Sequence, residues 1–366
     1  MLKPITQPFC CGALNACLEL QMHLLRWLCD PMTVADDVTQ INLAPPRVPT
    51  QIEADWLWRF LYGRKQTRLE QAKIIAGMSP AEKTALLGWS NSVVAVTAQF
   101  LPIPPVWPIT LPIIPAPAWT AVKGLMEAFY ERGLKSGLPY LANGTPVAAG
   151  GVSYASFIQA FRDAHRQNPD PNAREVCVLC GGPLGQTPEV DHWIAKSAFP
   201  LLSVCADNLL PICGECNSTV NKGEKDVHSL GNFADWFHPY LRPANGAVSL
   251  GYVLPELTVK CTSTLPADQS KVDNLNTLLN LADRWTREFK MEYARHQGAL
   301  RRREQDRIQR GETRHTQAEI QDYLQQWQIT DLVPSEPHHE VHKVLCAAMK
   351  EPARLAAWHS ELGLVS

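Results

Sequence analysis

Two Cys-x-x-Cys pairs constrain this chain more than any other feature of its sequence. Cys177 and Cys180 form the first pair, Cys213 and Cys216 form the second, and 32 residues separate them. Sulfur atoms placed on two tight turns can converge on one ion, and four thiolates are typical of a closed, structural zinc site. The gap exceeds that of a plain zinc ribbon, so a sizeable element must lie between the pairs. The alternative is four unligated cysteines in a reducing cell.

The other seven of the eleven cysteines do not indicate a disulfide framework, because they are scattered among apolar residues. They are Cys10, Cys11, Cys17, Cys29, Cys205, Cys261 and Cys346. The N-terminal apolar stretch contains Glu19, His23 and Arg26, which suits a buried helix better than a secretory signal. Reduced thiols and no evident export signal favour the cytoplasm.

An uncharged stretch from Thr84 to Val122 is long enough to span a bilayer. Seven prolines interrupt its second half, at positions 102, 104, 105, 108, 112, 115 and 117. Prolines remove backbone donors and break helices, and an irregular backbone exposed to lipid is not tolerated. We therefore expect a buried helix followed by an apolar, proline-rich strap at about 100–118, and no membrane partner. The alternative is that the strap is a surface on which a partner docks.

A series of Asp, His, Lys and Asn residues lies between the two cysteine pairs and just after the second. The chain reads Asp191-His192-Trp193-Ile194-Ala195-Lys196-Ser197, then Phe199-Pro200, then Asp207-Asn208-Leu209 before the second pair, then Asn217 and Asn221-Lys222-Gly223. This series resembles the HNH (ββα-metal) endonuclease family, in its four-cysteine, zinc-stapled bacterial type. The resemblance covers about residues 174–228.

The resemblance implies a catalytic role for each of four residues. His192 is the expected general base, since imidazole accepts a proton near neutral pH. Asp191 and Asn217 are expected to hold a catalytic Mg²⁺ or Mn²⁺, for which hard oxygen ligands are suited. Asn208 is expected to brace the loop that aims His192. The alternative is that these are ordinary surface and turn residues.

Two departures from the family pattern affect the site. Ala195 stands where the family usually has Pro. The family's Lys normally comes three residues after the Cys-Asn pair, where this chain has Val220, whereas Lys222 comes five residues after it. We expect Lys222 to contact a phosphate.

The expected fold is mainly α-helical, with a small α+β nuclease module in the middle. We place a helical region at 1–170, the HNH module at 171–240 and a helical C-terminal region at 241–366. Thr50 with Glu53, and Ser79 with Glu82, form capping-box patterns that begin helices. A long helix is predicted from about Ser270. His338 and His342 form an i,i+4 pair able to bind metal, but we expect only a solvated helix start there.

Net charge does not indicate a nucleic-acid binder, because it is −2 for the whole chain. Residues 171–240 are acidic, with four Lys or Arg against eight Asp or Glu. Binding would therefore depend on a local basic run further along the chain, whose candidate phosphate-contacting residues are Arg301, Arg302, Arg303 and Arg307. The alternative is a solvated helix face.

The resemblance implies a metal-dependent endonuclease that acts on DNA, with RNA not excluded. A bacterial antiphage-defence or restriction-type effector is the favoured setting, with a homodimer or a regulatory protein as partner. The alternatives are a toxin nuclease with an immunity partner, or a zinc-stapled nucleic-acid-binding module without cleavage.

Overall fold

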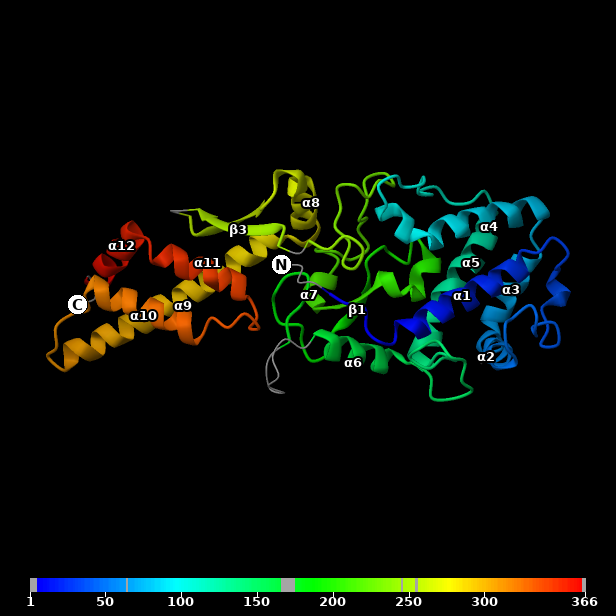
Figure 1. Cartoon of the computed structure of the whole chain (residues 1–366), viewed down its shortest axis with the longest axis horizontal. Helices are drawn as coiled ribbons and strands as arrows, with labels where there is room; N and C mark the ends of the chain where they lie inside the picture. The colour runs from blue at the N-terminus through cyan, green and yellow to red at the C-terminus, as the bar shows by residue number, and fades with distance from the viewer. Residues whose placement is uncertain (1–4, 64, 166–174, 245, 254–255, 364–366) are drawn as a thin grey trace.

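The computed structural model describes residues 5–63, 65–165, 175–244, 246–253 and 256–363. The molecule is elongated, with the N-terminal helices at one end, the C-terminal helices at the other and a small sheet between them (Figure 1). The expected mainly helical fold is confirmed, together with two small antiparallel sheets. The boundary expected near residue 170 lies outside the described residues.

In the described part of the chain, six α-helices precede the central sheet. They are α1 (Cys11–Leu28), α2 (Gln51–Leu61), α3 (Thr67–Ala76), α4 (Pro80–Val94), α5 (Ala116–Ala128) and α6 (Tyr154–His165). Short 3-10 turns lie at Ala35–Asp37 and Val96–Phe100, and a π-helical turn, Phe129–Leu134, extends α5. The predicted caps are confirmed, because the hydroxyls of Thr50 and Ser79 accept hydrogen bonds from the backbone N–H of Glu53 and Glu82.

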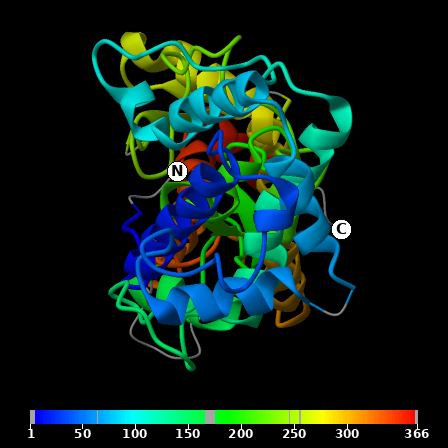
Figure 2. The same cartoon turned by 90° about the vertical axis from the view of Figure 1, so that its right-hand side faces the viewer.

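The core of the N-terminal part continues into the centre of the chain. Helices α1 and α5 are joined by a buried hydrogen bond from Gln21 Nε2 to the Met126 carbonyl, at 3.2 Å. The hydroxyl of Ser203, in the 3-10 turn Pro200–Val204, donates to the same carbonyl at 2.8 Å. Figure 2, seen from the N-terminal end, shows the central chain in green among the blue and cyan helices.

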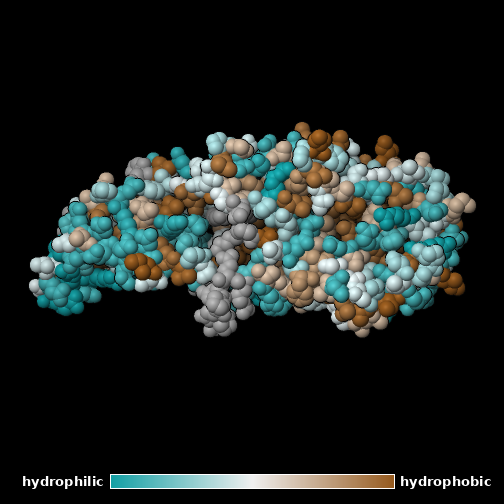
Figure 3. All heavy atoms as spheres, viewed as in Figure 1, coloured by the Kyte–Doolittle hydropathy of each residue, from teal (hydrophilic) through white to brown (hydrophobic). Residues whose placement is uncertain are grey.

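The proline-rich strap lies on the outside of this bundle. Six of its apolar side chains are exposed: Leu101, Ile103, Val106, Ile109, Leu111 and Ile113. Trp107 is buried, with its ring centre 5.0 Å from that of Phe199. Hydrophobic residues accordingly gather along the upper edge of the surface in Figure 3, where this segment runs. Within the described residues, no helix has the length and apolar character needed to cross a membrane.

The central sheet consists of two short antiparallel strands. Strand β1 (Glu189–His192) pairs with β2 (Leu209–Ile212), with His192 opposite Leu209. A 3-10 turn at Ala206–Asn208 precedes β2, and the short helix α7 (Gly214–Asn217) follows it. Two strands followed by a helix are the order of elements expected for the module.

The region from 241 onward, expected to be helical with a basic helix, also contains a second sheet. Strands β3 (Val248–Val253) and β4 (Thr258–Ser263) form a second antiparallel sheet that packs on α8 and α9. Their side chains are mostly half-buried, so the apolar-polar alternation that identifies a strand is weak.

The long helix predicted from Ser270 is two helices. Helix α8 (Gln269–Leu279) ends at Asn280, whose φ of 50° is left-handed, and α9 (Leu281–Gln309) begins directly after it. Asn tolerates this conformation better than most residues, and Asn280 Nδ2 also donates to Asn221 Oδ1 at 2.9 Å. A 3-10 turn at Pro266–Asp268 precedes α8, and the last three helices are α10 (Gln317–Thr330), α11 (His339–Met349) and α12 (Pro352–Gly363).

Candidate active site and zinc site

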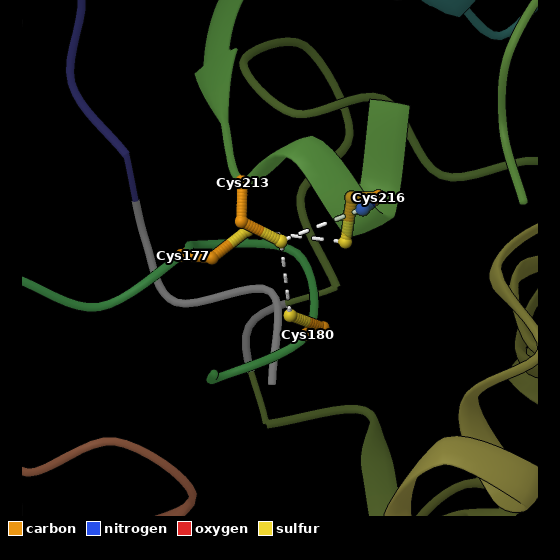
Figure 4. A group of neighbouring side chains, drawn as sticks. All are labelled: Cys177, Cys180, Cys213 and Cys216. Atoms are coloured by element: carbon orange, nitrogen blue, oxygen red, sulfur yellow. Dashed lines mark hydrogen bonds between the residues drawn. The ribbon is translucent and has the colours of Figure 1, made fainter. Parts of the chain in front are cut away.

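The four cysteines of the two pairs converge at one point, as Figure 4 shows. All four are buried, and their sulfur atoms lie within 4.8 Å of one another. The Cys177 and Cys216 sulfurs are 3.9 Å apart, and those of Cys180 and Cys213 are 3.8 Å apart. A tetrahedron with Zn–S distances of about 2.3 Å has sulfur–sulfur separations of about 3.8 Å. The cluster is therefore compatible with a structural zinc ion.

The backbone of both turns supports the sulfur atoms. Gly182 N–H donates to Cys180 Sγ at 3.3 Å, and Cys216 N–H donates to Cys213 Sγ at 3.4 Å. Gly181 has a φ of +74°, which a residue without Cβ adopts readily. Such N–H donors stabilise thiolate charge, as a zinc site requires.

Helix α9 begins against this cluster. Arg284 donates to Cys216 Sγ at 3.3 Å and forms an ion pair with Glu215 at 3.1 Å. The Trp285 indole donates to the Cys180 carbonyl at 2.9 Å. The C-terminal region is thus attached directly to the cysteine cluster.

The end of strand β1 carries the two residues expected to be catalytic. Asp191 and His192 are both buried, with 6% of each residue exposed. Asn208, just before β2, accepts from Ile194 N–H at 2.7 Å and donates to the Ile194 carbonyl at 2.9 Å. Asn208 therefore holds the loop that directly follows His192, in the manner of the brace expected for it.

The imidazole of His192 is held in one orientation. Its Nε2 lies 3.0 Å from the Ser203 carbonyl, which can only accept, so this nitrogen carries the hydrogen. The Tyr130 ring stands edge-on to it, with ring centres 4.6 Å apart. Burial lowers the pKa of His192 to about 3. The ring is therefore neutral at physiological pH, with the lone pair on Nδ1.

Lys222 does not lie where a phosphate contact would place it. Its side chain is fully buried, and its ammonium group lies 3.0 Å from Asp191 Oδ2 and 2.8 Å from the His192 carbonyl. Burial raises the pKa of Asp191 to about 6, although Lys222 opposes that shift. Lys222 in this position neutralises Asp191, and the expected phosphate contact would require it to move.

A pocket of about 470 Å³ opens beside these residues. Asp191, His192 and Asn217 all line it, whereas Asn208 does not. Asn217, at the end of α7, donates from Nδ2 to Glu189. The structure thus brings together three of the four expected catalytic residues on one open surface.

The N-terminal region contributes residues to this pocket that the sequence did not indicate. Glu131, from the π-helical turn after α5, forms an ion pair with Lys196, whose ammonium group lies 4.6 Å from the Tyr130 ring centre. Lys196 belongs to the motif and could have been assigned from it. Tyr130 and Glu131 lie about 60 residues earlier in the chain, and no local pattern connects them to the site.

The donor set of the pocket suits a hard divalent cation. Asp191 and Glu189 offer carboxylate oxygens and Asn217 an amide oxygen, which Mg²⁺ and Mn²⁺ accept. Lys222 competes for the same Asp191 oxygens. A cation held by Asp191 must therefore share that carboxylate with Lys222 or displace it.

The basic run lies in the last third of α9, a helix that leads away from the central sheet (Figure 1). Arg301 and Arg302 are exposed. Arg303 stacks over the Tyr323 ring at 4.7 Å, and Arg307 pairs with Glu319 at 2.7 Å. Two of the four arginines expected to bind nucleic acid thus contact α10.

Comparison with known proteins gives one partial similarity. The chain is 37% identical to protein ea31 of Escherichia phage lambda over 68 residues, which are 18% of this chain and 21% of that protein. The similarity thus spans about a fifth of the length of that relative. No known family matches the chain, and no solved structure matches it.

Proposed function

We propose that this protein is a metal-dependent endonuclease of the HNH type that hydrolyses phosphodiester bonds of DNA. The observation that carries the proposal is the arrangement at the end of β1. There His192 is neutral, held through Nε2 by Ser203 and next to Asp191, in an open pocket beside four converging cysteines. A buried histidine with a strongly shifted pKa in a pocket is a candidate functional group.

In this proposal, His192 takes a proton from water at Nδ1 as the water oxygen attacks phosphorus. The P–O bond to the leaving oxygen breaks, and that oxygen takes a proton from solvent. A divalent cation bound by Asp191 and Asn217 would supply charge stabilisation to the phosphate. Lys196 lies on the pocket wall and adds a cation there, although Glu131 partly neutralises it. The Ser203 carbonyl and the Tyr130 ring keep the imidazole in place during the reaction.

The charge distribution indicates where the substrate is held. The acidic central module repels a polyanion outside its immediate pocket. Affinity for DNA must then come from the exposed arginines of α9 or from a partner subunit. A single pocket of this kind attacks one strand, so a double-strand break requires two copies or two successive events.

The ion pair between Lys222 and Asp191 favours a second candidate function. If Lys222 keeps Asp191 from binding a cation, the module binds nucleic acid without cutting it. For a cleaving protein, the bacterial-defence or restriction-type setting remains our proposal, and a cognate immunity protein would instead indicate a toxin.

A plasmid-nicking assay distinguishes cleavage from binding alone. The purified chain is expected to nick supercoiled DNA with Mg²⁺ or Mn²⁺, to stop when EDTA is added and to resume when Mg²⁺ is restored. His192→Ala should abolish nicking at unchanged zinc content. The matched control is His359→Ala on α12, which lies at the C-terminal end of the molecule, away from the central sheet (Figure 1). Equal nicking by wild type and His192→Ala would refute the assignment, and DNA binding without any nicking would support the second candidate.

A further inference from the structure

A second group of metal-ligating side chains lies between α9 and α11. Glu288 and Glu292 are four residues apart on α9, and His338 and His342 are four residues apart at the start of α11. Residues at this spacing share one face of a helix. The two glutamates of α9 and the two histidines at the start of α11 face one another and form one cluster. The nuclease proposal does not use this cluster.

The distances in this cluster are those of potential ligands to a single ion. One ligand atom from each of Glu288, Glu292 and His342 lies within 4.8 Å of the other two. His342 Nε2 is 2.8 Å from Glu288 Oε1, and His338 Nε2 is 3.8 Å from Glu288 Oε2. Among the described residues, the only other group of this kind is the set of four cysteines.

The cluster is partly withdrawn from water and carries two negative charges. The side chains of Glu288 and Glu292 are 17% and 9% exposed, and that of His342 is 18% exposed. Two neighbouring carboxylates repel one another, and water screens this repulsion poorly at a half-buried interface. Arg295 and His296 contact Glu292 but not Glu288. A cation between the two glutamates would offset the remaining repulsion.

Hydrogen bonds and burial shift the pKa values of this cluster. The hydrogen bond from His342 lowers the pKa of Glu288. Burial opposes ionisation of Glu292, but hydrogen bonds from His296 and Arg295 lower its pKa to about 2. Burial lowers the pKa of His338. Ionised carboxylates and unprotonated imidazole nitrogens are the forms that bind a metal ion.

We propose that Glu288, Glu292 and His342, with His338 as a fourth ligand, bind one divalent transition ion of the zinc class. Mixed imidazole and carboxylate donors suit Zn²⁺ and its neighbours in the first transition row, whereas Mg²⁺ prefers oxygen alone. The proposal does not depend on the nuclease function.

The bound ion would connect α11 to α9 next to the cysteine cluster. His338 N–H donates to the Gly181 carbonyl at 2.6 Å, and Gly181 directly follows Cys180. The φ of His338 is 60°, a left-handed value that is uncommon for a residue other than Gly. Metal binding at the cluster would therefore hold the C-terminal helices against the zinc-bearing turn.

Metal counting on the full-length chain tests the proposal. After dialysis in zinc-buffered solution, elemental analysis should find two zinc ions per wild-type chain and one in Glu288→Gln/His342→Gln. Glu340→Gln is the matched control, because Glu340 is an exposed carboxylate on the same helix, and it should keep two. One zinc in all three proteins would overturn the proposal.

Cobalt substitution gives an answer that does not depend on the variants folding. Wild-type protein loaded with Co²⁺ should bind two equivalents. One should show the intense sulfur-to-cobalt charge-transfer band of the cysteine site, and the other only the weak visible bands of a nitrogen-and-oxygen site. Saturation at one equivalent, all of it with sulfur ligation, would show that the cluster is an ion-pair network only.

Discussion

Arg284 Nη1 lies 3.3 Å from Cys216 Sγ, and this hydrogen bond joins the first turn of α9 to the cysteine cluster. The Arg284 side chain is 6% exposed, and it also pairs with Glu215, which lies beside Cys216 in α7. A guanidinium at this position donates to a thiolate and offsets part of the charge of a four-sulfur site.

Arg284→Met should weaken zinc binding. Loss of a residue that hydrogen-bonds to a metal ligand typically lowers metal affinity by about 10–100-fold. Competition with a chromophoric chelator measures the change. Arg287→Met is the control, because Arg287 is exposed and contacts Glu215 but no cysteine. An equal loss of affinity in both variants would contradict the role given to Arg284.

Asp191→Ala should abolish activity, because the proposed metal-holding carboxylate is lost. It should also destabilise the fold, because the buried ammonium group of Lys222 is left without its charge partner. Breaking a buried pair from one side costs about 3–5 kcal/mol. Urea denaturation should show this loss, and Asp191→Asn/Lys222→Met should recover much of it.

Cys177→Ser should also destabilise the protein, but with loss of zinc. Zinc loss from the Asp191 variants would count against two separate metal roles.

Acidification should destabilise the protein through its buried histidines. Burial lowers the pKa of His192 and His238 to about 3, from an ordinary value of 6.5. Between pH 6.5 and 3, these histidines bind protons in the unfolded chain but not in the folded chain. The free energy of unfolding therefore falls as the pH is lowered from 6.5 toward 3. The raised pKa of Asp191, about 6, acts in the opposite direction.

The variant His238→Asn isolates one of these groups. In the wild type, the backbone N–H groups of Tyr240 and Leu241 donate hydrogen bonds to His238 Nδ1. Asn does not titrate, and its side-chain oxygen can accept these hydrogen bonds. Between pH 4 and 6, the free energy of unfolding should fall more steeply in wild type than in the variant. The difference should be about 1.4 kcal/mol per pH unit, the value for one proton. Parallel slopes would mean that His238 is already protonated in the folded state.

The arginines of α9 should divide into two groups. Arg301 and Arg302 are exposed, so Arg301→Ala/Arg302→Ala should weaken DNA binding and reduce the slope of log K against log salt by about 0.9 for each phosphate that is no longer neutralised. Arg307→Ala should leave that slope unchanged, because Arg307 pairs with Glu319 of the α10 capping box. Filter binding at several salt concentrations measures both. An unchanged slope in the double variant would assign the DNA affinity to a partner.

The sequence predicted those parts of the site that depend on local spacing. The cysteine pairs and the capping residues Thr50 and Ser79 act through neighbours three residues away, so their patterns are visible in the chain itself. The Asp-His pair was recognised only through its resemblance to a family, and its catalytic role stays a prediction.

What the sequence missed depends on contacts between distant segments. The partner of Lys222 is Asp191, 31 residues earlier, and that of His342 is Glu288, 54 residues earlier. His338 and His342, expected to be a solvated helix start, face α9 instead. The break at Asn280 is similar, since Asn280 contacts Asn221 across 59 residues. The periodicity of a helix or a strand in the sequence does not predict contacts between residues so far apart in the chain.

The position of Ser203 limits how far the central module can be separated from its surroundings. Its carbonyl accepts from His192, and its hydroxyl donates to Met126 on α5. The imidazole is thus aligned by a helix that belongs to the N-terminal part of the chain. A segment cut at 171–240 and grafted onto another protein would carry the motif and the cysteines without that alignment. The segment to transfer is therefore residues 171–240 together with α5, because a graft without α5 would carry the sequence motif without a positioned histidine.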